Sequence, residues 1–359
     1  MLLGPSLDAV SGVSTHLNQL RGSSLASQFT LLHFQIGSEG RQESLVKKLI
    51  RYVCSPLQFC IQLLKHKPQI VHLNTSMDLK SFWRDLAYFF IAHVMGKKIV
   101  YQVHGGDLPA DFFIRSKALS SLLKQALCRA DIVILLTQEE LQAYKKFAPG
   151  IRLELIANAV DPGTDPAWKK HPPVQPRPLR LVYLGRLAES KGIFELVDAL
   201  ALTHRQGMAI ELTIAGSGPD ESRLRSLVDK LALTACVNFA GVVTGEEKKR
   251  IWEWADLFVF PTYYEGLPYA LLEGMAARTP PLVSAVGGIP DLIDDGVHGL
   301  LIALKDPVAL ASAIARLNSD RQLICHMGEA CRQRVASGYS IERLAQDICR
   351  TYRNVLHAF

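Results

Sequence analysis

Short apolar, β-branched runs alternate along the whole chain with segments of helical periodicity, and this alternation limits the possible folds more than any other feature. The runs typical of strands cover residues 70–73, 98–103, 131–136, 179–184, 210–215, 257–260 and 281–284. Strands separated by helices pair in parallel, so the pattern predicts an α/β protein built on parallel sheets. The chain opens Met1-Leu-Leu-Gly-Pro5, which leaves an expected first strand of barely three residues.

A proline-rich stretch divides this pattern in two. Six prolines with little periodicity precede a second strand–helix series: Pro162, Pro166, Pro172, Pro173, Pro176 and Pro178. A chain of 359 residues is long enough for two domains. We predict a Rossmann-like domain over 1–160, a linker over 161–179 and a second Rossmann-like domain over 180–339, with a ligand cleft between the carboxyl ends of their strands.

The composition is typical of a soluble protein from a reducing compartment. Hydrophobic residues make up 48% of the chain, and no apolar run approaches the roughly 18 residues of a membrane span. The N-terminus lacks the pattern of a secretory signal, so we expect a cytoplasmic location. The seven cysteines include no Cys-x-x-Cys pair, which argues against a disulfide framework and a structural zinc site.

The positive charge is concentrated in the first half of the chain. Residues 1–180 contain 22 Lys and Arg against 13 Asp and Glu, whereas residues 181–359 contain 18 against 21. Nucleic acid or an anionic membrane would each explain such a bias. The segment 45–67 interleaves five basic residues with large apolar ones, which favours the membrane surface and argues against nucleic acid. Pro56 is expected to kink or split this helix, and an ordinary packed helix with a basic outer edge is the alternative to a membrane-binding one.

Two carboxylates eight positions apart stand out in the second half. Glu265 precedes a turn marked by Gly266 and Pro268, and Glu273 falls inside the helix that follows. A carboxylate accepts two adjacent hydroxyl groups, as on a ribose or hexose, and a helix N-terminus favours phosphate nearby. The pair therefore predicts a binding site for a sugar nucleotide. The alternative is that both side chains are solvated on the surface of a helix.

Two cations lie at the mouth of a predicted helix after the strand 179–184. Arg186 follows a glycine turn, and Lys191 lies five residues further on. Arginine pairs bidentately with phosphate oxygens and lysine adds a point charge, so together they suit a diphosphate; a surface pair is the alternative. In the N-terminal half, Gly12 ends a loop that leads into a helix and offers bare backbone amides to phosphate or sugar.

His104 is the candidate catalytic residue of the N-terminal domain. It follows a predicted strand in the sequence Val103-His-Gly-Gly-Asp107, so its imidazole is expected to project into the cleft. A core histidine with satisfied hydrogen bonds is the alternative. Asp107 is interpreted either as an acceptor-side residue or as a helix cap.

Together these segments resemble the retaining glycosyltransferases of family 4, which have the GT-B fold. The resemblance rests on the Glu-x7-Glu pair, on Gly185-Arg-Leu followed by Lys191-Gly192, and on most of the chain between them. It implies that Arg186 and Lys191 hold the diphosphate, Glu273 the ribose and Glu265 the sugar hydroxyls. It further implies contacts from backbone amides around Gly266, Leu267 and Pro268. It also implies a place for His104 beside the transferred sugar, and a last helix, at about 340–359, that crosses back onto the N-terminal domain.

Some positions depart from the pattern of the family. Ser11-Gly12 stands where members usually carry two glycines, so the resemblance favours Gly12 for donor contact. Asn158 lies between alanines in a turn that is usually Pro-Asn-Gly, and is interpreted as structural. Gly241 resembles the strand end whose backbone faces the base. The run from Gly216 to Gly218 lacks the third glycine of a dinucleotide fingerprint, which argues against NAD.

The segment 72–85 places polar and basic groups after a strand and is interpreted as an acceptor wall or, equally, as a helix cap with solvated charges. The resemblance to enzymes of cell-surface polysaccharide assembly implies a glycan or lipid-linked acceptor.

The resulting expectation is a metal-independent, retaining hexosyltransferase with a nucleoside diphosphate sugar as donor, UDP favoured over GDP, no separate cofactor and no metal site. We expect it in the cytoplasm, with peripheral contact to the inner face of an anionic membrane through the basic N-terminal domain. Two alternatives remain: a nucleotide-sugar epimerase on the same fold, and a catalytically silent, membrane-associated binding subunit.

Overall fold

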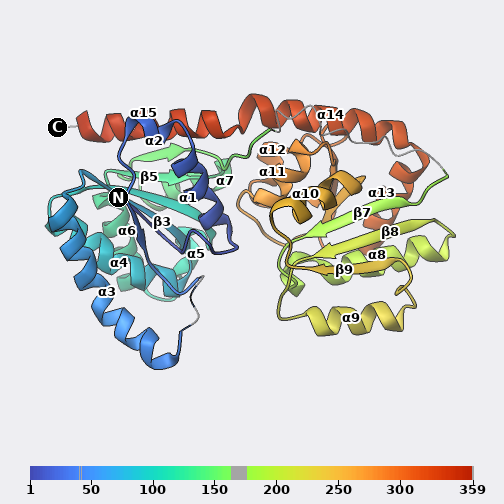
Figure 1. The fold of residues 1–359 in the computed structure, drawn as a ribbon, viewed down its shortest axis with the longest axis horizontal. Coiled ribbons are helices and arrows are strands. Elements are labelled where there is room, and N and C mark those ends of the chain that lie inside the picture. Colours follow the sequence, from blue (N-terminus) through green and yellow to red (C-terminus); the bar gives the residue numbers. More distant parts are fainter. Residues whose placement is uncertain (40, 42, 163–175, 358–359) are drawn as a thin grey trace. The chain divides into compact units, whose positions relative to one another are not determined.

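The computed structural model describes residues 1–39, 41, 43–162 and 176–357 and consists of two compact units (Figure 1). Unit 1 contains Met1–Ala159 and Ile341–Phe359, and unit 2 contains Val160–Ser340. Most of the predicted linker, including Pro166, Pro172 and Pro173, lies outside the described residues.

Unit 1 is built on a parallel sheet of six strands in the order β2-β1-β3-β4-β5-β6. Its strands are β1 (Leu2–Gly4), β2 (His33–Gln35), β3 (Ile70–Met77), β4 (Lys98–Gly106), β5 (Ile132–Leu135) and β6 (Leu153–Leu155). The expected short first strand is confirmed, because β1 has three residues and pairs with both β2 and β3.

The helices of unit 1 cover both faces of this sheet. They are α1 (Gly12–Gly22), α2 (Leu25–Gln28), α3 (Leu45–His66), α4 (Leu79–Val94), α5 (Pro109–Phe112), α6 (Lys117–Arg129), α7 (Gln138–Phe147) and α15 (Ile341–His357). The helix α3 runs through Pro56 without a break, so the predicted split does not occur. On one face, Phe59 of α3 and Phe89 of α4 pack on Val71 and Leu73 of β3.

The C-terminal helix α15 completes the other face of unit 1, where it lies beside α1 and α2 (Figure 1). Its buried side chains recur every three or four residues, and Ile348 and Tyr352 pack with Ile70 and Val100 of the sheet. Because side chains alternate along a strand, the residues two and four positions after Ile70 in β3 and after Val100 in β4 point to the same face of the sheet. That face therefore receives the polar side chains near the carboxyl ends of β3 and β4.

Unit 2 contains a second parallel sheet of six strands, in the order β12-β11-β10-β7-β8-β9. Its strands are β7 (Leu179–Leu184), β8 (Ile210–Ala215), β9 (Val237–Gly241), β10 (Leu257–Phe260), β11 (Pro281–Ser284) and β12 (Leu300–Ile302). The predicted α/β fold with two Rossmann-like parallel sheets is therefore confirmed.

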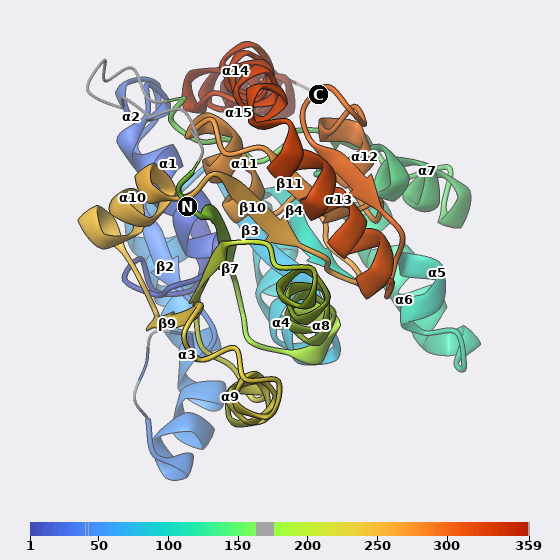
Figure 2. The same ribbon diagram turned by 90° about the vertical axis from the view of Figure 1, so that its right-hand side faces the viewer.

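Helices cover both faces of the second sheet as well. They are η1 (Glu189–Lys191), α8 (Ile193–Arg205), α9 (Glu221–Lys230), α10 (Gly245–Trp254), α11 (Tyr269–Ala276), α12 (Ile289–Leu292), α13 (Pro307–Ser319) and α14 (Arg321–Gly338). Figure 1 shows α10 and α11 on one side of the sheet and α8 and α9 on the other, and α8 packs against α13 (Figure 2).

The strand order of unit 2 reverses between β7 and β10. The first three strands of the unit extend to one side of this point and the last three to the other. Connections that leave in opposite directions open a crevice at the carboxyl ends of the two central strands, where ligands bind in open α/β sheets. A ligand site is therefore expected at the turns after β7 and β10.

Candidate active site

The turn after β7 carries Arg186 and Lys191. Arg186 is exposed, and its guanidinium has no ion pair or side-chain hydrogen bond with any residue that the structure describes. Lys191 ends the short helix η1 and is followed by Gly192 in a left-handed conformation, at φ 68°. A Cβ atom on Gly192 would lie 1.9 Å from the carbonyl oxygen of Pro261, so glycine is required for the two turns to approach.

The turn after β10 presents Glu265 to Lys191. The amide of Tyr263 donates to the carbonyl of Ser190 at 2.9 Å and fixes the two turns side by side. The ammonium group of Lys191 then reaches the carboxylate of Glu265 and forms an ion pair. Burial raises the pKa of Glu265 above its ordinary value, and Lys191 opposes that shift.

A third turn, after β11, supports the segment from Glu265 to Pro268 from behind. The amide of Gly288 donates to the carbonyl of Gly266 at 2.9 Å. Gly287 has φ 56°, and a Cβ atom there would lie 1.6 Å from the carbonyl oxygen of Glu265. The side chain of Leu267 is buried at 4% exposure. The backbone of this segment is therefore held by both neighbouring turns.

Pro268 is the N-cap residue of α11, and Glu273 lies in the second turn of that helix. The carboxylate of Glu273 accepts a hydrogen bond from the ammonium group of Lys248 at 2.7 Å. Lys248 belongs to α10 and was not among the sequence candidates. Both predicted carboxylates thus face a lysine from another segment of unit 2.

The glycines after β8 and β9 bring two further turns to the same end of the sheet. Gly241 ends β9 at φ 69° and accepts a hydrogen bond from the amide of Gly216 at 2.6 Å. A Cβ atom on Gly216 would lie 1.9 Å from the carbonyl oxygen of Gly185, and one on Gly218 would lie 2.1 Å from that of Leu187. These two glycines therefore allow close packing against the turn that carries Arg186.

His104 of unit 1 lies at the carboxyl end of β4 and contacts Asn74 of β3. The amide nitrogen of Asn74 donates to the carbonyls of Leu3 and His72, so its oxygen faces the Nε2 atom of His104 at 3.0 Å. Nε2 must then carry the proton, and Nδ1 has the free lone pair. Burial lowers the pKa of His104 well below its ordinary value, with a further contribution from His16. The ring is therefore neutral.

Two more buried histidines surround this pair. His16 of α1 meets the ring of His104 edge-on, with 4.7 Å between ring centroids. His72 lies two residues before Asn74 in β3, on the same face of the sheet, and its Nδ1 atom is 2.7 Å from the hydroxyl of Tyr352 of α15. Gly12, in contrast, is exposed and begins α1, where Ser11 caps the helix by accepting from the amide of Ser14.

In the segment 72–85, interpreted either as an acceptor wall or as a helix cap with solvated charges, the structure shows a helix cap, but one of the charges is not solvated. Asp85 is fully buried inside α4 and receives hydrogen bonds from both Arg84 and Thr75. The cap of that helix is Asp78, which accepts from the amides of Lys80 and Ser81 at 3.0 Å. Asp107 is exposed, and Asn158 is buried at 4% exposure.

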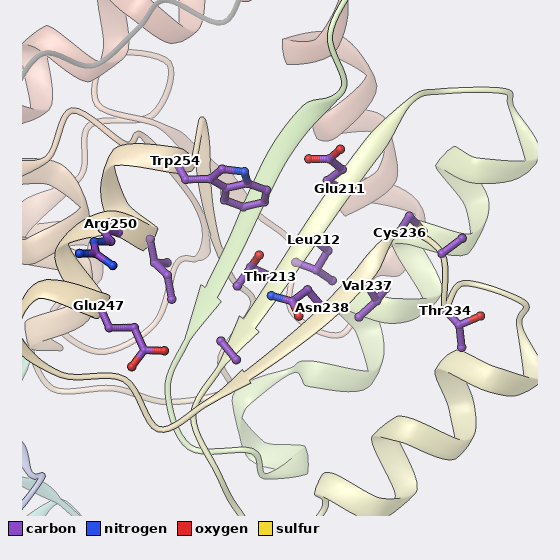
Figure 3. Close-up of a pocket in the computed structure, with 13 residues that line it drawn as sticks. Glu211, Leu212, Thr213, Thr234, Cys236, Val237, Asn238, Glu247, Arg250 and Trp254 are labelled. Atoms are coloured by element: carbon purple, nitrogen blue, oxygen red, sulfur yellow. The ribbon is translucent and has the colours of Figure 1, made fainter.

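A pocket of about 610 Å³ opens beside the edge strand β9 (Figure 3). Thr213 of β8, Asn238 of β9 and Trp254 of α10 are among the residues that line it. Its lining comes from α10, from the segment before β9 and from the amino-terminal parts of β8 and β9, whereas ligands of such sheets bind at the carboxyl ends. None of the predicted site residues lines it.

The described part of the chain holds no group of three or more His, Cys, Asp or Glu side chains suited to a metal ion. The absence of a metal from the reaction stays a prediction. Within the same residues, no helix is both long and apolar enough to cross a membrane.

Two family models match adjoining parts of the chain. Residues 35–164 match the model described as Glycosyltransferase Family 4, and residues 165–334 match Glycosyl transferases group 1. The amylovoran biosynthesis glycosyltransferase AmsK of Erwinia amylovora is 29% identical over 87% of this chain and 74% of its own length. The putative colanic acid biosynthesis glycosyltransferase WcaL of Salmonella typhimurium is 29% identical over 50% of this chain and 46% of its own.

Solved structures match the whole fold. The Anabaena protein Alr3699/HepE in complex with UDP aligns over 98% of this chain and 99% of its own, with a TM-score of 0.77 and 17% identity. Sucrose-phosphate synthase from Thermosynechococcus elongatus aligns over 100% and 99%, with a TM-score of 0.79 and 21% identity.

Proposed function

The chain belongs to glycosyltransferase family 4 and has the GT-B fold, and from this premise we propose that it is a metal-independent, retaining hexosyltransferase. The donor is a nucleoside diphosphate sugar, with UDP favoured over GDP. The acceptor is a hydroxyl group of a glycan or of a lipid-linked glycan.

One observation carries this proposal: the turn after β7 brings Lys191 against the carboxylate of Glu265 at the switch point of the unit 2 sheet, and the same turn carries the unpaired guanidinium of Arg186. The turns after β7 and β10 supply the two groups, and the glycine contacts described above hold these turns together. A nucleotide sugar needs both kinds of group, because its diphosphate is anionic and its sugars carry hydroxyl donors.

The proposal gives each of the candidate side chains a role. Arg186 and Lys191 bind the diphosphate, and Lys191 leaves or shares its contact with Glu265 when the donor enters. Glu273 accepts from the ribose hydroxyls, and Glu265 accepts from the hexose. The amides of Gly266 and Leu267, held next to Pro268 at the start of α11, add contacts, and the backbone at Gly241 faces the base.

The chemistry of transfer needs no protein base in this proposal. The bond between the anomeric carbon and the diphosphate oxygen breaks, and the two cations stabilise the negative charge that develops on the leaving group. The acceptor oxygen attacks from the face that the diphosphate leaves, and a phosphate oxygen takes its proton. The anomeric configuration is therefore retained. His104, as a neutral ring in unit 1, contacts the transferred sugar without adding positive charge.

The comparisons support the choice of donor and acceptor. Three solved structures of HepE contain UDP, UDP with glucose, or UDP-glucose, which favours a UDP-hexose for this chain. The names of AmsK and WcaL refer to amylovoran and colanic acid biosynthesis, which favours cell-surface polysaccharide assembly. We further propose that the protein works in the cytoplasm, at the inner face of a membrane.

A transfer assay with a panel of UDP- and GDP-hexoses tests this function, using lipid-linked and soluble glycan acceptors. We expect a product of retained anomeric configuration by NMR, formed equally well in EDTA. Arg186→Ala should lower turnover at saturating donor by about 100-fold, as for removal of one group that stabilises a developing charge. Wild-type turnover in that variant would refute the assigned role. Conversion of the donor without any acceptor would instead indicate an epimerase.

A further inference from the structure

The helix α3 of unit 1 exposes a continuous row of apolar side chains. The row contains Val46, Ile50, Val53, Leu57, Ile61 and Leu64, and each of these side chains is between 56% and 68% exposed. Their spacing of three or four residues places them on one face of the helix. Large apolar side chains gathered in this way mark an interaction surface, unlike single exposed ones.

The opposite face of α3 already anchors the helix to unit 1. Phe59 and Leu63 are buried in the core at 0% and 1% exposure. Ser55 accepts a hydrogen bond from the hydroxyl of Tyr88 of α4 at 2.8 Å, and the rings of Phe59 and Tyr88 meet edge-on. The exposed row is therefore not needed to hold α3 in place.

The neighbouring helix α4 has an exposed apolar face of its own. Leu79, Trp83, Phe90 and Val94 are 57%, 48%, 64% and 68% exposed, and their spacing places them on one face of that helix. Trp83 adds an aromatic side chain of the kind enriched at membrane–water interfaces. Two packed helices thus each leave an apolar face uncovered.

The charge of α3 indicates what covers this surface. The helix contains no Asp or Glu, whereas it carries Lys47, Lys48, Arg51 and Lys65 and is followed by Lys67. Of these, Arg51 pairs with Glu43 at 3.0 Å. A second copy of the chain would bring cations against cations, which is unfavourable, whereas the headgroups of anionic lipids complement them.

We propose that α3 docks this protein on an anionic membrane, lying in the plane of the interface with its apolar row in the acyl boundary and its lysines at the phosphates. The described helices include none able to cross a bilayer, which is consistent with a helix that lies on the surface. The proposal supplies the contact needed to reach a lipid-linked acceptor in the proposed function. It does not require that function, because lipid binding is measured without donor or acceptor.

The test is sedimentation of the full chain with vesicles of phosphatidylcholine alone or with added phosphatidylglycerol. We expect binding to the anionic vesicles only. The variant Ile50→Ser/Leu57→Ser/Ile61→Ser should lose it. A matched control in unit 2, Val297→Ser/Leu304→Ser/Val308→Ser, removes side chains of 46% to 62% exposure and should bind like the wild type.

A second pair of variants separates apolar insertion from charge. Lys47→Gln/Lys65→Gln should weaken binding to anionic vesicles on the order of tenfold. Lys145→Gln/Lys146→Gln removes the same charge from α7, at exposed positions of the same unit, and should have little effect. Unchanged Tm values show that the variants fold.

Three results would overturn the proposal. The first is wild-type protein that binds neither kind of vesicle, and the second is a loss of vesicle binding in the control variants equal to that in the α3 variants. The third is self-association of the wild type that the α3 triple variant abolishes. Preserved thermal stabilisation by UDP in the α3 variants would show that such a failure does not touch the proposed function.

Discussion

Replacing Gly192 by alanine should destabilise unit 2 through one identifiable contact. The residue adopts φ 68°, and its added Cβ atom would meet the carbonyl oxygen, the carbonyl carbon and Cγ of Pro261 at 1.9, 2.6 and 2.9 Å. The carbonyl atoms belong to the backbone and cannot rotate away. The turn with Lys191 must therefore move from the turn with Glu265.

The magnitude follows from two separable costs. A left-handed conformation costs an L-residue about 1–2 kcal/mol, and forcing atoms into an occupied space costs about 1–3 kcal/mol more. Gly207 provides a matched control at the other end of α8. It has φ 75°, and a Cβ atom there would meet nothing within 4 Å. Gly207→Ala should therefore carry only the first cost.

Thermal unfolding of both variants measures the difference. For a unit of this size, about 1–3 kcal/mol corresponds to a Tm about 2–12 °C lower for Gly192→Ala than for Gly207→Ala. Gly192→Ala should also weaken UDP binding, because it separates the two turns, whereas Gly207→Ala should not. Equal Tm values for the two variants would refute the inference that the turns are held by this close approach.

Two further predictions concern stability. Burial lowers the pKa of His16 to about 4, below its unfolded value near 6.5, so the unfolded state binds more protons in this range. The contribution of His16 to the free energy of unfolding is then fully present above pH 6.5 and falls by about 3 kcal/mol as the pH approaches 4. Urea unfolding at a series of pH values measures this profile, and His16→Phe should flatten it. An unchanged slope in that variant would contradict the prediction. Arg177 donates to both oxygens of Asp256 at 2.7 and 2.8 Å, and that carboxylate is 1% exposed. Arg177→Ala should cost about 2–4 kcal/mol, because the buried carboxylate loses its bidentate cation and keeps a hydrogen bond from the amide of Arg180. A loss below about 1 kcal/mol would count against this.

The sequence predicts the central strands better than the edge strands. The runs at 179–184, 210–215, 257–260 and 281–284 coincide with β7, β8, β10 and β11. Apart from β1, the strands absent from the apolar runs are β2, β6, β9 and β12. All four lie at a sheet edge, and β2, β6 and β12 have only three residues each. An edge strand is buried on fewer sides, so its apolar signal is short and weak.

In the candidate site, too, the sequence predicts local features better than contacts between distant segments. The sequence correctly predicts that Arg186 follows a strand and that Glu273 lies in a helix, because strand ends, glycine turns and helix starts are local features. The partners of these groups come from distant segments. Lys248 contacts Glu273, and Asn74 contacts His104 across neighbouring strands. These two contacts cannot be predicted from the sequence until the fold is known.

The requirement for Gly192 and Gly287 is also tertiary. Each glycine faces a carbonyl oxygen of a neighbouring turn, and that distance depends on the order of strands in the sheet. In contrast, the amphipathic pattern of α3 is plain in the sequence. What the structure adds is that its apolar row remains exposed after its other face is buried.

The central claim is that the switch point of unit 2 binds a nucleoside diphosphate, and calorimetric titration with UDP, GDP and ADP tests it most directly. We expect UDP to bind, and we expect Glu273→Ala to lose that binding. Thermal melting gives an independent check, since ligand at 100 times its Kd stabilises by about 2.7 kcal/mol. Absence of binding by all three nucleotides, or binding unaffected in Glu273→Ala, would contradict the claim.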